Sequence, residues 1–154
     1  MPKHTEKREM PYSADQLFDL VADIGSYPDF LPWVSAARIR RVTETRTGKV
    51  IEADLVVSFR VFREKFGSRV TLNEQTQEIH VEYLEGPFKY LNNHWRFVAL
   101  GDARCAVEFF VDFEFRSRAL QALIGVVFNE AMHRIVRAFE ARAAALYGPG
   151  KSRN

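Results

Sequence analysis

One strand followed directly by one long helix constrains the fold of this chain most. Residues 107–115 read V-E-F-F-V-D-F-E-F, with apolar side chains at the odd positions and acidic ones at 108, 112 and 114. This alternation predicts a strand with one buried and one solvent-facing side. Residues 117–147 predict a helix, because Ser117 is a good N-cap and apolar residues follow at helical spacing. The phenylalanine side of the strand is the simplest partner for that helix.

The region from residue 34 to 115 predicts strands joined by short turns. Residues 50–59 alternate, and Asp54 is expected on their solvent-facing side. Gly67 is expected to form a bulge or bend, and a loop is expected from residue 85 to about 93. Other strand-like runs cover residues 36–44, 62–72, 79–83 and 94–99. Successive strands with short turns form an antiparallel meander.

Two short helices are expected after a first strand at residues 3–10. Residues 13–16 match a capping box, which predicts a helix to about Asp23 that Gly25 ends. A second helix is expected to begin at Ser26, with Pro28 in its first turn. The whole order predicts an α+β fold in which a curved antiparallel sheet of about seven strands wraps around the C-terminal helix. We expect one domain over residues 1–148 and a disordered basic tail at 149–154.

The residue types that carry chemistry do not form a catalytic or metal-binding pattern. No histidine stands at metal-ligand spacing from another His, Cys or carboxylate, and neither a nucleophile elbow nor a phosphate-binding loop is present. The single Cys105 excludes an intramolecular disulfide. We therefore expect no catalytic residue, no metal and no covalently bound cofactor. The formal net charge of +2 does not predict a DNA-binding protein.

Charge and hydropathy set expectations for location and surface contacts. The N-terminus shows no apolar core of a signal peptide, and no run approaches the ~20 apolar residues of a membrane span. We expect a cytoplasmic protein whose membrane contact, if any, is peripheral at the inner face. Arg38, Arg40 and Arg41 form a basic patch. Such a patch either protects the sheet edge and keeps the protein soluble, or binds anionic lipid headgroups or RNA phosphates.

Three segments resemble one family over about residues 2–148. They are Y-P-D-F-L-P-W at 27–33, W-R-F at 95–97 and the F-E-x-R-A-x-x-L-Y-G ending at 139–148. They resemble the coenzyme Q-binding, START-like branch of the helix-grip superfamily. The same branch includes bacterial proteins described as ribosome association toxins and proteins described as polyketide cyclase-like.

The resemblance implies a hydrophobic tunnel that holds ubiquinone or another polyprenyl lipid without catalysis, in support of respiratory electron transport. It implies two alternatives as well. One is a translation regulator that binds the large ribosomal subunit, for which two basic patches are the only sequence hint: the one named above and a second at Arg60, Arg63, Lys65 and Arg69. The other is a polyketide cyclase or aromatase-like enzyme, which needs polar groups inside the cavity, where few are expected.

The cavity hypothesis names specific residues. The expected lining consists of inward-facing apolar side chains from the strands and the last helix: Leu55, Phe59, Val70, Leu72, Val81, Trp95, Phe97, Phe109, Val111, Phe113, Ile124, Val127 and Phe128. Residues in loop-like segments with aromatic side chains are candidates for a gate: Phe30, Trp33, Pro87 and Phe88.

Overall fold

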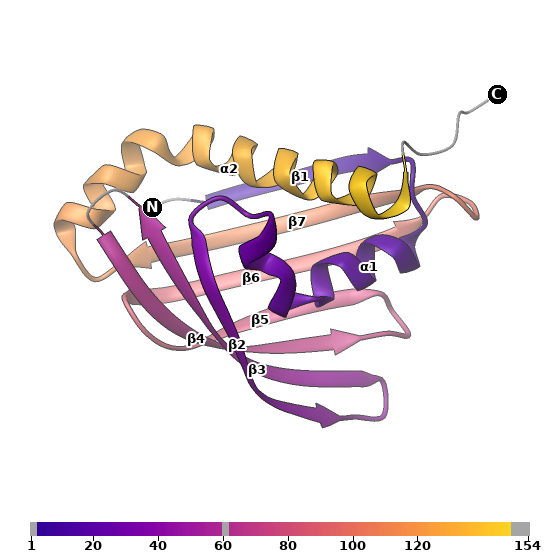
Figure 1. The fold of residues 1–154 in the computed structure, drawn as a ribbon, viewed down its shortest axis with the longest axis horizontal. Coiled ribbons are helices and arrows are strands. Elements are labelled where there is room, and N and C mark those ends of the chain that lie inside the picture. Colours follow the sequence, from indigo (N-terminus) through magenta and orange to yellow (C-terminus); the bar gives the residue numbers. More distant parts are fainter. Residues whose placement is uncertain (1–2, 60–61, 149–154) are drawn as a thin grey trace.

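The computed structural model describes residues 3–59 and 62–148, and within them it has the element order expected from the sequence (Figure 1). The predicted tail at 149–154 lies outside the described residues. The elements are β1 (Lys3–Met10), α1 (Ala14–Ala22), the 3-10 helix η1 (Ile24–Asp29), β2 (Val34–Glu44), β3 (Gly48–Phe59), β4 (Phe62–Asn73), β5 (Glu78–Glu85), β6 (Phe88–Ala99), β7 (Cys105–Phe115) and α2 (Arg118–Tyr147).

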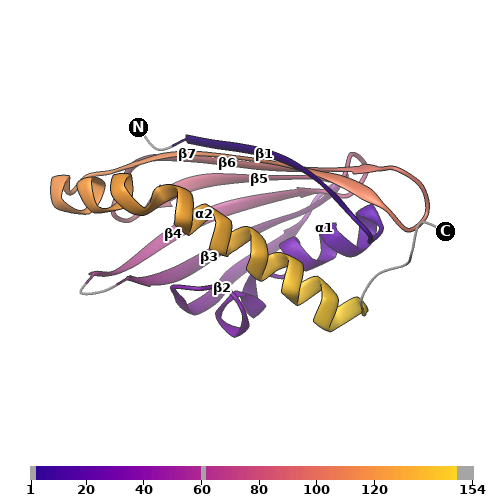
Figure 2. The same ribbon diagram turned by 90° about the horizontal axis from the view of Figure 1, so that it is seen from above.

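The strands form one antiparallel sheet in the order β1-β7-β6-β5-β4-β3-β2. The sheet is curved, and α2 runs across its concave side (Figure 2). Figures 1 and 2 both place α1 near the C-terminal end of α2, whereas the start of α2 lies at the opposite end of the molecule. The predicted helix-grip architecture is therefore confirmed.

Local hydrogen bonds define the helix ends as the sequence indicates. The Gln16 amide donates to Ser13 Oγ at 3.1 Å, and the Ser13 amide donates to Gln16 Oε1 at 3.0 Å, which confirms the capping box. Ser117 Oγ accepts from the Leu120 amide at the start of α2. At the other end of α2, the Tyr147 hydroxyl donates to the Gln16 carbonyl at 2.9 Å. The last turn of α2 is therefore tied to α1.

Two expectations about turns are wrong. Gly25 does not end a helix but lies inside η1, which begins at Ile24; Ser26 is not its cap, and its hydroxyl donates to Asp23 Oδ2 at 2.6 Å. The expected loop at 85–93 is only a short connection, because β6 already begins at Phe88. Gly86 makes this tight turn possible: its φ is 140°, and a Cβ there would lie 2.5 Å from Phe66 Cβ.

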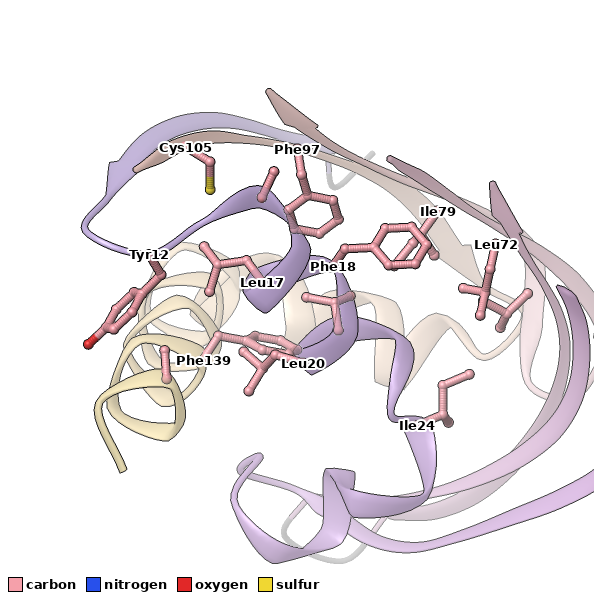
Figure 3. Close-up of a cluster of buried hydrophobic side chains, with 14 of the residues drawn as sticks. Tyr12, Leu17, Phe18, Leu20, Ile24, Leu72, Ile79, Phe97, Cys105 and Phe139 are labelled. Atoms are coloured by element: carbon pink, nitrogen blue, oxygen red, sulfur yellow. The ribbon is translucent and has the colours of Figure 1, made fainter. Parts of the chain in front are cut away.

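The packed core lies under α1 (Figure 3). Ile79 of β5 is only 1% exposed, and the Phe18 ring meets the Phe97 ring edge-on with centroids 6.0 Å apart. Cys105 is also fully buried there, and burial raises the pKa of its thiol to about 11. A thiol held neutral in this way is a structural residue and not a nucleophile.

Candidate functional site: two apolar cavities beneath helix α2

Two apolar cavities lie between α2 and the sheet, and Ile135 lines both of them. The larger has a volume of about 220 Å³ and the smaller about 50 Å³. The larger cavity lies beneath the N-terminal half of α2, and apolar side chains of β3, β4, β6, β7 and α2 form its walls. Among the described residues that line it, Glu64 is the only titratable one.

Aromatic rings fix one wall of the larger cavity. Phe88 stacks on Phe115 with centroids 4.6 Å apart, and Phe66 and Phe113 meet its ring edge-on. The Phe88 amide donates to the Tyr83 hydroxyl at 3.1 Å, which holds the backbone beneath these rings. A wall of this kind binds apolar surface and offers no acid or base to a substrate.

The predicted lining residues divide into three groups. The larger cavity is lined by Phe59, Val111, Phe113, Ile124 and Val127. The smaller is lined by Trp95, Phe97 and Phe109. The others line neither cavity and pack in the core instead: Leu55, Val70, Leu72, Val81 and Phe128. Most of this last group lies where α1 covers the sheet, so protein side chains fill the space there.

The predicted gate residues lie in two different places. Trp33, Pro87 and Phe88 line the larger cavity, although Phe88 is a buried strand residue and not part of a loop. Phe30 lines neither cavity. Its ring packs edge-on against Phe139, with the Arg142 guanidinium carbon 5.1 Å from the ring centroid. Gating by these residues stays a prediction.

A polar array on the inward side of β1 was missed by the sequence analysis. Arg8 Nε donates to Glu6 Oε2 and Arg8 Nη1 donates to Glu140 Oε2 of α2, both at 2.9 Å. His4 Nε2 lies 2.9 Å from Glu6 Oε1. Burial opposes ionisation of Glu6, but the hydrogen bonds from His4 and Arg8 outweigh it and hold its pKa below the usual value. The Glu6 carboxylate is therefore ionised at neutral pH.

This array changes the picture of the interior. Glu6, Arg8 and Glu140 line the smaller cavity, which apolar residues such as Phe97 and Phe139 otherwise surround. The inward positions named for the other strands are apolar as expected, and β1 and α2 add these three polar residues, of which Arg8 is exposed. A cavity lined by apolar residues alone would argue against the enzyme alternative. The smaller cavity also has polar residues in its lining, so that alternative is retained.

The basic patch lies on β2, an edge strand of the sheet. A register shift between Ile39 and Arg41 makes Arg40 an extra residue, and all three arginines are exposed. Arg40 Nε lies 3.5 Å from Asp54 Oδ1, and Arg40 Nη2 lies 3.8 Å from Glu85 Oε1. Asp54 is thus buried beside Arg40, contrary to the expected solvent-facing position, and the charge of Arg40 is largely balanced.

The described residues show neither a metal site nor a membrane span. No group of three His, Cys, Asp or Glu side chains within residues 3–59 and 62–148 is placed to hold a metal ion. None of the helices in this part of the chain is long and apolar enough to cross a membrane.

Comparisons with known proteins agree with this geometry. The family model described as "Polyketide cyclase / dehydrase and lipid transport" matches residues 10–140. The ribosome association toxin RatA of Escherichia coli K12 is 33% identical over 147 residues, which cover 96% of this chain and 90% of RatA. The mitochondrial coenzyme Q-binding protein COQ10 homolog B of Xenopus laevis is 31% identical over 150 residues, covering 95% of this chain and 59% of that protein.

A solved structure also matches nearly the whole chain. The solution structure of the 18 kDa protein CC1736 from Caulobacter crescentus is 38% identical and superposes with a TM-score of 0.79. The match covers 96% of this chain and 99% of CC1736. The similarity therefore extends from sequence to the complete fold.

Proposed function

Because the chain belongs to the polyketide cyclase/dehydrase and lipid transport family, we propose that it binds a polyprenyl quinone such as ubiquinone, or a similar lipid. The larger cavity is the observation that carries this proposal, since its walls are apolar and aromatic over about 220 Å³. The name of the COQ10 relative supports the quinone as ligand. The ligand is held and released unchanged, in support of respiratory electron transport.

The size of the cavity limits how such a ligand sits. Sites that enclose drug-sized molecules have volumes of roughly 300–1,000 Å³. A cavity of about 220 Å³ therefore takes one section of a polyprenyl quinone, and the rest of the chain must leave it. Trp33 and Pro87 at its edge are the proposed gate beside the exit.

Extraction of protein purified without detergent tests this proposal. We expect organic solvent to release a quinone that mass spectrometry identifies, because an apolar cavity keeps such a ligand through purification. A Val127→Trp variant, which fills the cavity, is expected to retain about tenfold less quinone, the effect of losing ~1.4 kcal/mol of binding free energy.

Leu146 near the other end of α2 provides the matched control. It is 51% exposed and lines neither cavity, so Leu146→Trp is expected to retain quinone as the wild type does. If the wild type yields no quinone and binds none when it is added, the proposal is wrong.

A second candidate function is binding to the large ribosomal subunit. Two observations favour it: the RatA relative matches 96% of this chain, and β2 carries three exposed arginines. RNA binding through such a patch is governed by charge and falls steeply with salt. Arg38 and Arg41 are the proposed contacts, since Arg40 already faces Asp54 and Glu85.

Charge reversal tests the ribosome candidate. Co-sedimentation with large subunits is expected to weaken when the salt concentration is raised, because each arginine neutralises about one phosphate. The double variant Arg38→Glu/Arg41→Glu is expected to weaken it at least as much at low salt. The control Arg134→Glu/Arg137→Glu changes the net charge equally on the exposed side of α2. Equal effects of the two double variants would argue against a contact through β2.

A cyclase-like activity is kept as the further alternative because the polar array borders the smaller cavity. Its groups pair with one another at 2.9 Å, so catalysis by Glu6 or Glu140 requires a substrate that displaces Arg8. Binding without catalysis needs no such rearrangement, and we propose it for that reason.

A further inference from the structure

The first part of α2 is apolar on both of its sides. The sequence from residue 119 to 129 contains no charged residue. Leu120, Ile124 and Val127 face the larger cavity, as expected for a helix that covers a sheet. The opposite side carries Val126, which is 84% exposed, with the small residues Ala119, Ala122 and Gly125 and one polar residue, Asn129. A helix that is hydrophobic all round is normally covered on both sides.

The larger cavity reaches the same end of the molecule. Figures 1 and 2 show the start of α2 and the facing ends of β3 and β4 at the end opposite α1. Phe59, Phe62 and Trp33 line the cavity there and are only half-buried, and Glu64 beside them is exposed. An apolar cavity edge and an exposed apolar helix side therefore lie together.

Cations flank this apolar region. Arg116 and Arg118 are exposed at the start of α2, and Arg63 and Lys65 are exposed on β4. Arg116 is fixed at the cavity edge, because its amide donates to the Pro87 carbonyl at 2.8 Å and its Nε to the Phe88 carbonyl at 3.1 Å. Acidic residues lie in this region as well: Glu64 is exposed, Glu114 lies 3.8 Å from Lys89, and Glu85 lies 3.8 Å from Arg40.

We propose that this end of the molecule, which we call the docking end (Ala119, Ala122, Val126, Arg116 and Arg118), binds the surface of an anionic lipid bilayer. A bilayer offers both features that the docking end matches, headgroup phosphates for the arginines and an acyl boundary for the valine and alanines. RNA would match the arginines alone. The inference rests on the proposed lipid-binding function, and it adds that cargo enters the larger cavity directly from the membrane.

Vesicle co-sedimentation tests the docking end. The full-length protein is expected to bind vesicles of phosphatidylcholine with phosphatidylglycerol, and pure phosphatidylcholine vesicles more weakly. Val126→Asp is expected to weaken binding about tenfold or more, and Arg118→Gln about fivefold on the anionic vesicles only. Leu146→Asp is the matched control, because Leu146 is a 51% exposed apolar residue near the other end of the same helix.

A second measurement separates this inference from the proposed function. Binding of a short-chain ubiquinone analogue without vesicles is expected to be unchanged in Val126→Asp, as followed by the quenching of tryptophan fluorescence, to which Trp33 and Trp95 both contribute. The docking end is wrong if the protein binds the analogue but does not bind vesicles. It is also wrong if Leu146→Asp weakens vesicle binding as much as Val126→Asp does. In both cases the proposed lipid binding in the cavity still holds. If Val126→Asp instead weakens only sedimentation with ribosomal subunits, the lipid surface is the wrong partner. Failure of the analogue to bind contradicts the proposed function itself.

Discussion

Replacing Ile79 with alanine is expected to lower the free energy of unfolding by about 2–5 kcal/mol, and the same change at Ile124 by clearly less. Ile79 is 1% exposed and packed on all sides beneath α1. Ile124 is half-buried and faces the larger cavity, so part of its surface has no contacts to lose. The pair therefore measures whether the space beneath α2 is hollow.

Urea unfolding followed by circular dichroism gives both values. Alanine gains up to about 0.7 kcal/mol of helix propensity at position 124, so the difference between the variants must exceed about 1 kcal/mol to be meaningful. Equal losses would show that side chains fill the cavity in solution. Added quinone is expected to raise the stability of the wild type, because it binds only the folded state.

The fold follows largely from local signals in the sequence. The alternation at 107–115, the capping box at Ser13 and the cap at Ser117 are each decided within a few residues, and the structure confirms all three. The antiparallel order of β2 to β7 follows in turn, because short turns leave consecutive strands no other neighbours.

The position of the cavity could not be predicted in the same way. Alternation shows which side of the sheet a residue faces but not where along the sheet a helix covers it. Val70 and Val111 both face inward, yet Val70 packs in the core under α1 and Val111 lines the larger cavity. Only the placement of α1 at one end of the sheet distinguishes these two residues.

Local sequence patterns also could not predict which side chains pair when they are far apart in the sequence. Arg8 and Glu140 meet because edge strand β1 lies beside the C-terminal half of α2. Residues 3–10 predicted a strand, but nothing in them indicated that His4, Glu6 and Arg8 lie on its inward side. Asp54 is buried because the bulge in β2 brings Arg40 to it. This bulge contains no glycine, so the residues around Arg40 do not indicate it in advance.

Val111→Arg is expected to abolish lipid binding, with an affinity at least about 100-fold lower, a loss of roughly 3 kcal/mol. Val111 lies in the middle of β7, between His4 of β1 and Asn93 of β6, and its side chain lines the larger cavity. An arginine there brings a charge into walls whose only titratable described residue is the exposed Glu64. The guanidinium would also occupy the space that the lipid needs.

The adjacent position separates this effect from damage to the strand. Phe110 points to the outer side of the sheet, where it is half-buried beside Thr5 and His94. Phe110→Arg keeps its charge in water while the stem covers the sheet, so it is expected to retain lipid binding and to change stability by less than about 1 kcal/mol. Val111→Arg is expected to cost more, because an unpaired charge inside a protein destabilises it by about 3–5 kcal/mol. Quinone binding and urea unfolding of both variants measure the contrast, and a Val111→Arg protein that still binds quinone would place the ligand outside the larger cavity.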